Sequence, residues 1–420
     1  MKIILVRSVL FFAAVYCFIA ANYNNTNSNL FGDNNSVSPS TNAVKYVTPH
    51  GTGDHSGSSW TNAYSFKDMQ DKLTSNTSYY LIDSTFVVDS IFISNLSGLS
   101  FIGKGKTKTI LQGQSNPFDD DPYLWSIKGF DLENADNITI KDIQIRKFRG
   151  FGIRVDAASS YFYAYNDSIV NCGWAAVEND TLVIAAPSGV KLLGDDATFR
   201  RCYVMYSGWD GMQVGAYRIV IDSTIIYATG QDPNVISQGD GIGAVVNKDS
   251  SYYVHINETD SVIVYKSAQF TVTNSEINTV YPIKSGIEAG EKDSSKHSEK
   301  PLVQIYNCKI TGGKGVGITQ DAHPRVGHFY SSIQGSKIKS LDPERPTCRI
   351  DSADPSPYNT PSWGSIKNNT FYSPEGYNPF VGKDCPVGEF YTDSTAVLYL
   401  NNTWIKADTL TDFCVKHNAE

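Results

Sequence analysis

The sequence predicts an all-β solenoid in which bent strands stack in parallel, one turn upon the next. Three observations predict it. A motif of two apolar residues, a polar pivot and an apolar residue of opposite parity recurs, as in "ITIKDIQI" around Asp142. Most pivots lie 22 to 35 residues apart, which suits one turn of a solenoid. Two-residue Asn-Gly and Asp-Gly hairpin signals are few, which disfavours the alternative of an antiparallel sandwich.

The bulk composition agrees with a strand-rich fold. The chain has 420 residues, of which 41% are hydrophobic, so it can fill a sizeable core. Tyr and Phe number 25 and 20 against 4 Met, and aromatic side chains favour pleated strands. The net charge of −8 argues against a nucleic-acid partner, because phosphate binding needs clustered Lys and Arg. We expect a monomer.

The first 21 residues are expected to be an export signal. A basic start is followed by the apolar run "SVLFFAAVYCFIAA", which ends in the small residues Ala20 and Ala21. This run is too short for a comfortable membrane span. A lipid anchor on Cys17 is the alternative. We expect a protein that is secreted or held at the cell surface, with no membrane contact once the signal is removed.

The remaining chain divides by composition. Residues 22–43 are rich in Asn, Ser and Thr and are expected to form a flexible leader. The solenoid is expected over residues 44–410. It includes an N-terminal cap over 44–80, and a C-terminal cap at about 375–420.

The N-terminal cap is expected to contain one short helix. Ser65 and Asp68 have capping-box spacing, and Phe66, Met69 and Leu73 fall on one helical face. A solenoid leaves its first turn uncovered, so an amphipathic helix behind a glycine-rich loop would cover that end. The loop is therefore interpreted as a lid rather than a phosphate cradle.

The pivots mark where the strands bend. They are expected at Asp142, Asn166, Arg201, Ser223, Asn274, Asn307, Asn368 and Asn402. Asn tolerates left-handed backbone, and stacked Asn side chains can bond one another. The two longest intervals, of 51 and 61 residues, require either a missed turn or a long loop.

Six cysteines follow the export signal, and secretion permits disulfides among them. No zinc-type spacing is present. A bridge would help most in the last, least regular stretch. The six are Cys172, Cys202, Cys308, Cys348, Cys385 and Cys414.

With these pivots and the opening "YVTPHGTGDHSGSSWTNAYSFKDMQDKL", residues 44–410 resemble the secreted proteins of the pectate-lyase-like superfamily. The resemblance implies a right-handed parallel β-helix with a short N-terminal capping helix. It leaves the activity open, because this fold carries many functions.

A second motif, Gly followed by an apolar residue, recurs after several pivots. If these strands stack, "WDG" and "GDG" place Asp210 and Asp240 on adjacent turns, about 4.8 Å apart. Glu288 would lie one turn further on and one row across. The two predicted columns are Phe151, Asp210, Asp240, Ser285 and Val316, and Arg154, Gln213, Gly243, Glu288 and Thr319.

Three interpretations of this carboxylate group stay open. Asp-Gly can simply close a turn at the start of a strand. Paired carboxylates can act as acid and base, as in glycoside hydrolysis. Carboxylates on neighbouring turns can also hold Ca²⁺. Calcium is thus a possible cofactor, with Asp210, Asp240 and Glu288 as its candidate ligands.

Further candidates lie in nearby loops. "GITQDAHPRVGH" supplies Asp321, His323 and Arg325, which could serve as acid, base or anion binder, and Lys284 could serve as a lyase base. Sugar rings stack on exposed aromatic faces, so Trp209 and Tyr217 are candidate substrate-binding residues, and Gln213 between them is a third. For most of the other aromatics, including those of "YFYAY" at 161–165, core packing is the favoured interpretation.

The sequence therefore predicts a polysaccharide-active protein, with a glycoside hydrolase or polysaccharide lyase as the leading hypothesis. The alternative is a non-catalytic carbohydrate-binding or adhesin-like surface protein. The two differ in whether Asp210, Asp240 and Glu288 face a substrate together.

Overall fold

The computed structural model describes most of the chain from residue 42 onward. The described residues are 42–113, 128–174, 176–178, 181–184, 187–227, 229–230, 239–244, 247–255, 261–279, 285–289, 297–298, 302–312, 316–319, 330–340, 348–351, 362–373, 395–400 and 403–406. The chain divides into two units, Met1–Asn42 and Ala43–Glu420, and the second contains every strand named below. Among the described residues, no helix has the length and apolarity needed to cross a membrane.

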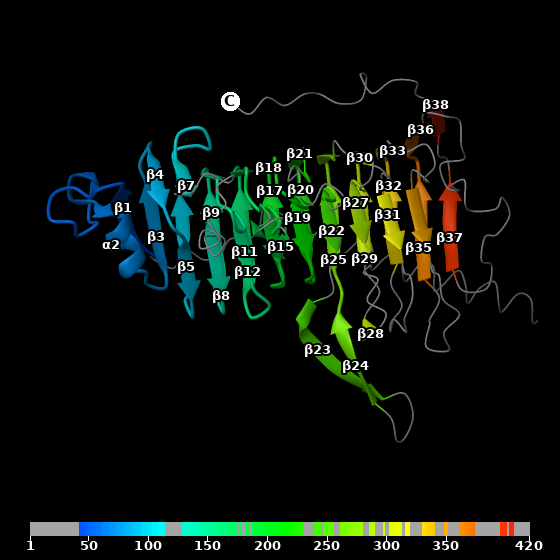
Figure 1. The fold of residues 1–420 in the computed structure, drawn as a ribbon, viewed down its shortest axis with the longest axis horizontal. Helices are drawn as coiled ribbons and strands as arrows, with labels where there is room; N and C mark the ends of the chain where they lie inside the picture. The colour runs from blue at the N-terminus through cyan, green and yellow to red at the C-terminus, as the bar shows by residue number, and fades with distance from the viewer. Residues whose placement is uncertain are drawn as a thin grey trace, which may run out of the picture. The chain divides into compact units, whose positions relative to one another are not determined.

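Three parallel sheets build the second unit (Figure 1), and each is described in its spatial order. Sheet A contains β2 (Tyr64–Ser65), β1 (Ala43–Thr48), β3 (Thr77–Leu81), β6 (Ser100–Ile102), β9 (Asp136–Lys141), β12 (Ser160–Tyr165), β17 (Thr198–Arg200), β20 (Ile219–Asp222), β25 (Gln269–Thr273), β29 (Leu302–Tyr306), β32 (Tyr330–Gln334), β35 (Ser362–Lys367) and β37 (Thr395–Leu400). Sheet B contains β4 (Thr85–Val88), β7 (Ile110–Gly113), β10 (Gln144–Arg146), β13 (Ser168–Val170), β18 (Tyr203–Met205), β21 (Ile225–Tyr227), β26 (Glu276–Asn278), β30 (Lys309–Gly312), β33 (Lys337–Ser340), β36 (Thr370–Ser373) and β38 (Thr403–Lys406). Sheet C contains β5 (Ile91–Ser94), β8 (Phe130–Glu133), β11 (Ile153–Val155), β16 (Val190–Leu192), β19 (Met212–Val214), β22 (Ile242–Ala244), β27 (Ile287–Ala289), β31 (Val316–Thr319) and β34 (Cys348–Asp351).

The chain visits the three sheets in a fixed cycle. From β8 in sheet C it passes to β9 in sheet A, then to β10 in sheet B, and returns to sheet C with β11. Each strand pairs in parallel with its counterparts on the neighbouring turns, as β9 does with β6 and β12. This is the right-handed parallel β-helix that the sequence predicts.

The bend from sheet A to sheet B confirms the pivot prediction. The seven predicted pivots within the described residues all have left-handed backbone, with φ between 50° and 60°. Stacked pivot side chains also bond one another. Asn166 Nδ2 donates to Asp142 Oδ1 at 2.5 Å, and Asn307 Nδ2 donates to Asn274 Oδ1 at 3.4 Å. Asn402 lies outside the described residues.

The two long intervals have different causes. β20 pairs directly with β25, so Ser223 and Asn274 lie on consecutive turns and the extra residues form an insertion. By contrast, β32 lies between β29 and β35, so the interval from Asn307 to Asn368 contains two turns. Its missed corner is Gly335, with φ 64°, which the sequence pattern did not reveal because the expected residue was polar.

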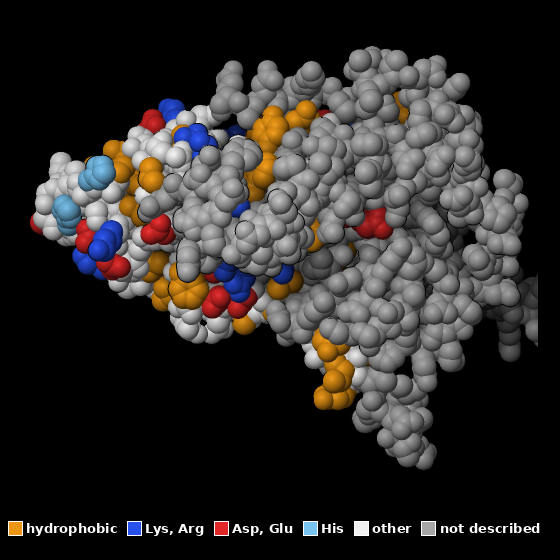
Figure 2. All heavy atoms as spheres, in the orientation of Figure 1, with side chains coloured by type: hydrophobic (Ala, Val, Ile, Leu, Met, Phe, Trp, Pro, Cys, Tyr) orange, Lys and Arg blue, Asp and Glu red, His pale blue; other side chains and the backbone are white. Residues whose placement is uncertain are grey.

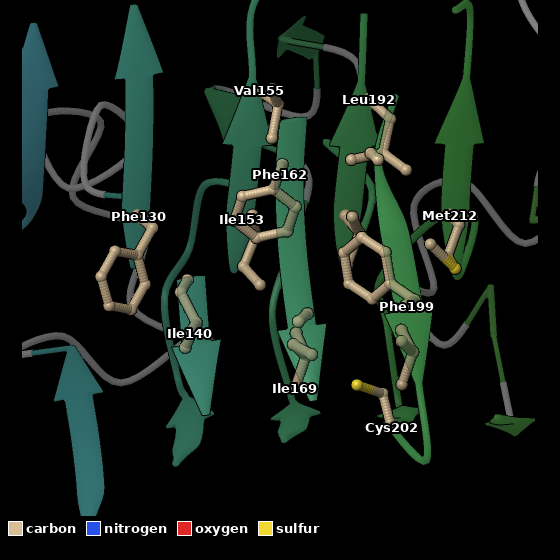
Figure 3. Packing of buried hydrophobic residues seen from close by; sticks show 14 of the residues in the cluster. Phe130, Ile140, Ile153, Val155, Phe162, Ile169, Leu192, Phe199, Cys202 and Met212 are labelled. Carbon is tan, nitrogen blue, oxygen red and sulfur yellow. The ribbon is translucent and has the colours of Figure 1, made fainter. Parts of the chain in front are cut away.

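Apolar side chains from all three sheets fill the interior. Figure 3 shows Phe162 from sheet A, Ile169 from sheet B and Ile153 from sheet C converging there, and all three are at most 1% exposed. Phe162 also packs on Phe199 of the next turn, with ring centroids 5.6 Å apart. Burial of one such side chain stabilises the fold by about 1.5–3 kcal/mol. The alternating pattern thus holds each turn on its neighbours.

One corner of the interior is polar. The residue after each described pivot is buried, and where it carries an oxygen its side chain accepts a backbone N–H of the turn before it. Thr224 N–H donates to Ser275 Oγ at 3.1 Å, and Cys308 N–H donates to Ser336 Oγ at 3.1 Å. At Asp167, complete burial raises the pKa of the carboxyl well above its ordinary value, although it accepts Ile143 N–H at 2.9 Å. These side chains satisfy main-chain groups where the sheet hydrogen bonds are interrupted.

Helix α2 (Phe66–Asp71) forms where the sequence predicts it, after the 3₁₀ helix η1 (Trp60–Asn62). Ser65 and Asp68 form the reciprocal capping box. Phe66 and Met69 are buried in the core. Hydrogen bonds from Ser65 and His55 hold the pKa of the Asp68 carboxyl below its usual range. The role of this helix as a cover for the first turn stays a prediction.

Two hairpins are inserted between turns. One consists of β14 (Ala176–Glu178) and β15 (Thr181–Ile184). The other consists of β23 (Asn247–His255) and β24 (Ser261–Lys266), and β24 also pairs with β28 (His297–Ser298). This second hairpin projects from the stacked strands (Figure 1), and Figure 2 shows hydrophobic side chains on it. Its exposed Tyr253 and Ile263 are cross-strand partners.

Three of the cysteines are free thiols in the interior. Cys172, Cys202 and Cys308 are at most 3% exposed and form no disulfide. Burial raises the pKa of the Cys172 and Cys308 thiols to about 12, so they are protonated at neutral pH. For these three, export would permit a disulfide but the structure has none.

Candidate active site on sheet C

The outward face of sheet C carries one continuous column of side chains. Strands such as β19 bury their first and third residues, here Met212 and Val214, so the middle residue points outward. In register, the column contains Phe92, Asp131, Arg154, Lys191, Gln213, Gly243 and Glu288.

Asp210 and Asp240 lie on adjacent turns, each just before its strand. The Asp240 N–H donates to Asp210 Oδ1 at 2.8 Å, and Gln213 Nε2 donates to Asp210 Oδ2 at 3.0 Å. Asp210 is 5% exposed, whereas Asp240 is half-buried. The two aspartates therefore lie next to each other on adjacent turns, as predicted. Both carboxylate oxygens of Asp210 accept hydrogen bonds, and one of these bonds attaches the next turn.

Ser285 connects Asp240 to Glu288. Its N–H donates to Asp240 Oδ1 at 2.8 Å, and its hydroxyl donates to Glu288 Oε2 at 2.5 Å. Both carboxylates are half-buried, so both reach solvent. Asp210, Asp240 and Glu288 thus lie on three consecutive turns, joined by main-chain and hydroxyl hydrogen bonds.

Gly243 leaves space beside Asp210. A Cβ at residue 243 would lie 3.1 Å from Asp210 Oδ2, closer than ordinary van der Waals contact. The column therefore has no side chain between Gln213 and Glu288. At this point the carboxylate of Asp210 lies against the backbone of the next turn.

The three predicted substrate-binding residues flank β19. Trp209 precedes the strand, and its carbonyl accepts the Gly230 N–H at 2.7 Å. Gln213 is the outward residue of the strand itself. Tyr217 follows it, and the Lys266 ammonium lies 4.6 Å from the centroid of its ring. The two aromatics therefore lie at opposite ends of one short strand and do not form a single platform.

The N-terminal half of the column contains charged residues that the sequence reasoning did not assign to the site. Arg154 lies 3.1 Å from Asp131 Oδ1 and 3.1 Å from Glu133 Oε1. The Lys128 ammonium lies 2.5 Å from Asp131 Oδ2, and the Lys191 ammonium lies 5.6 Å from the ring centroid of Phe151. The available signal was the same Gly-apolar motif, present in "KGFDL" at 128 and "SGVKL" at 188.

One predicted register is wrong. Val316 pairs with Ile287, and Gly317 with Glu288, so neither Val316 nor Thr319 belongs to its predicted column. Thr319 instead pairs with Asp351. "KGVGIT" contains two glycines two residues apart, and both registers keep the apolar residues inward. Strand alternation alone could not choose between them.

Four of the predicted catalytic residues remain. Lys284, Asp321, His323 and Arg325 lie outside the described residues. Within the described part of the chain, no three His, Cys, Asp or Glu side chains converge as a metal-binding group.

The three parallel sheets and the left-handed corners between them define a right-handed parallel β-helix. Among solved structures, the chain is similar to a rhamnogalacturonan lyase, with 12% identity, a TM-score of 0.50, and 86% of this chain and 87% of that chain covered. It is also similar to pectate lyase Pel9A (14% identity, TM-score 0.47, coverage 87% and 78%). A third similar structure is PfbA, a surface adhesin of Streptococcus pneumoniae (10% identity, TM-score 0.46, coverage 79% and 84%).

At these identities the similarity establishes the fold and not an activity. No family model matches the chain, and no curated protein matches it.

Proposed function

We propose that this protein is a secreted polysaccharide-active enzyme, a glycoside hydrolase or polysaccharide lyase, that binds its polymer along the outward face of sheet C. The observation that carries the proposal is the bridge made by Ser285, which connects the carboxylates of Asp240 and Glu288 on consecutive turns. Linked carboxylates can divide the roles of acid and base. The fold shared with a rhamnogalacturonan lyase supports the substrate class.

The roles within the group follow from exposure. Asp240 and Glu288 are half-buried and are the candidate acid and base. Asp210 is 5% exposed and has both oxygens in hydrogen bonds, so it is a positioning residue for the turn that carries Asp240. Trp209, Gln213 and Tyr217 are proposed to contact the sugar chain on either side of β19.

The test is a polysaccharide panel read in two ways. New reducing ends without new absorbance from unsaturated products indicate hydrolysis, and unsaturated products indicate elimination. Asp240→Asn and Glu288→Gln are expected to lower turnover by at least about a hundredfold. Glu276→Gln on sheet B is the matched control and should retain activity. Wild-type rates in both site variants would place the chemistry elsewhere.

A non-catalytic carbohydrate-binding or adhesin-like protein is the second candidate. One observation favours it: the carboxylates of Asp210 and Asp240 each accept a backbone N–H of the next turn, which gives them a purely structural use. Retention on a polysaccharide without any product from the whole panel would support this candidate over the enzyme.

Two further parts of the proposal have their own tests. If Ca²⁺ contributes, EDTA should abolish activity and added Ca²⁺ should restore it. If residues 1–21 are an export signal, the exported protein should begin near residue 22, as read by mass spectrometry of the intact chain.

A further inference from the structure

A row of tyrosines covers the outward side of β12 on sheet A, away from the column of sheet C. Phe162 and Ala164 are buried, whereas Tyr161 is 57% exposed and Tyr163 and Tyr165 are half-buried. The core interpretation of "YFYAY" is therefore wrong for the three tyrosines. The rings of Tyr163 and Tyr165 stack, with centroids 6.1 Å apart and planes 15° from parallel.

Cations from two neighbouring segments lie against this row. The Lys141 ammonium on β9 lies 5.4 Å from the Tyr165 ring centroid. The Arg201 guanidinium, just after β17, lies 5.6 Å from the same centroid and donates to the Tyr165 hydroxyl at 2.7 Å. Figure 1 shows β9, β12 and β17 side by side, as their register requires.

Neither cation is neutralised by a carboxylate within the described residues. The nearby Arg200 pairs with Asp222 at 3.0 Å, and Asp142 accepts from Asn166. Lys141 and Arg201 make no ion pair there, and most of the five guanidinium donors of Arg201 remain available. Partial burial raises the pKa of the Tyr163 phenol, so this ring stays uncharged at neutral pH and does not repel an anion.

Flat aromatic faces beside unpaired cations match one kind of ligand. Sugar rings stack their apolar faces on aromatic side chains, and carboxylate or sulfate groups pair with Lys and Arg. A neutral polymer would not use the cations. The local positive charge also contrasts with the net charge of −8 of the whole chain, which would repel a polyanion elsewhere.

We propose that Tyr161, Tyr163, Tyr165, Lys141 and Arg201 form a binding surface for an acidic polysaccharide. This tyrosine surface is separate from Asp240 and Glu288, and it does not depend on the proposed enzymatic activity. A second binding surface would hold the protein on its polymer while sheet C stays open to another segment or another chain.

The experiment measures binding of the full chain to polygalacturonate, with neutral glucomannan and a single-stranded DNA oligomer as comparison ligands. It uses the Asp240→Asn, Glu288→Gln double variant as background, so that turnover cannot change the ligand. Polygalacturonate is expected to bind in low salt, to weaken at high salt and to outcompete glucomannan. DNA binding without polygalacturonate binding would overturn the inference, as would no binding of polygalacturonate.

Single variants then locate the surface. Tyr161→Ala and Arg201→Gln change exposed residues, so folding should survive, and each is expected to raise Kd about tenfold. Tyr253→Ala and Lys337→Gln are the matched controls, because they remove an exposed tyrosine and an exposed lysine elsewhere. Equal Kd values for all four variants would overturn the inference. So would full binding by Tyr161→Ala and Arg201→Gln together.

Discussion

The carboxylate of Asp210 accepts the backbone N–H of Asp240 at 2.8 Å, and this bond joins two consecutive turns just before their strands begin. Asp210→Ala removes the acceptor and leaves that N–H without its partner. The expected loss is about 1–3 kcal/mol in the free energy of unfolding, measured by urea denaturation. Asp210→Asn keeps one carbonyl oxygen and should lose less. Equal stability of the Ala variant and wild type would show that the bond contributes nothing.

The free energy of unfolding should also be sensitive to substitution of Gly243. Because a Cβ at this position lies 3.1 Å from Asp210 Oδ2, Gly243→Val must displace the carboxylate or its strand. We expect about 1–3 kcal/mol of destabilisation, typical of an overpacked site, and a lower rate on any substrate found. Urea denaturation and the polysaccharide assay measure the two effects. A Val variant as stable and active as wild type contradicts the packing described here.

Asp222 should make the fold sensitive to acid. Burial alone would raise the pKa of its carboxyl, but hydrogen bonds from Thr273 and Asn274 and the nearby Arg200 outweigh it, so the pKa is lowered. The stabilisation is therefore present above the unfolded pKa of about 4 and is lost as pH falls through the lower folded value.

Thermal unfolding from about pH 6 to about pH 2 tests this sign. The difference in Tm between wild type and Asp222→Asn should be largest near the highest pH of this range and should disappear toward the lowest pH. A gap that widens on acidification would contradict the lowered pKa.

The buried thiols should not react with thiol reagents in the folded protein. Cys172, Cys202 and Cys308 are protonated and at most 3% exposed, so a thiol reagent that requires thiolate should not reach them. We expect these three to react only after denaturation, with no reductant needed. The readout is peptide mapping of alkylated cysteines before and after unfolding. Prompt labelling of any of the three in native protein would contradict their burial.

The sequence revealed the solenoid because its signals are local. Each pivot sits between strands whose apolar parity flips, and that flip follows directly from the need to keep apolar residues inward at a bend. Left-handed residues also occur near the other two corners, for example at Tyr161 and Tyr206. Tyr is unusual in that conformation, so composition could not identify these corners.

The candidate site was harder to predict because it depends on register and on insertions. The repeat length was enough to predict that Asp210 and Asp240 lie on adjacent turns. The hydrogen bond from the Ser285 hydroxyl to Glu288 could not be predicted, because it depends on the side-chain conformation of Ser285. The tyrosines of β12 were misassigned because an aromatic on a strand fits either face until its neighbours are known.

The inward polar corner has a consequence for how the protein is made. Each of its N–H groups finds its acceptor on a later turn, as Thr224 does on Ser275, 51 positions downstream. In a nascent chain, the last turn synthesised therefore has a corner N–H whose acceptor has not yet been made. A chain truncated there would leave that N–H without its acceptor.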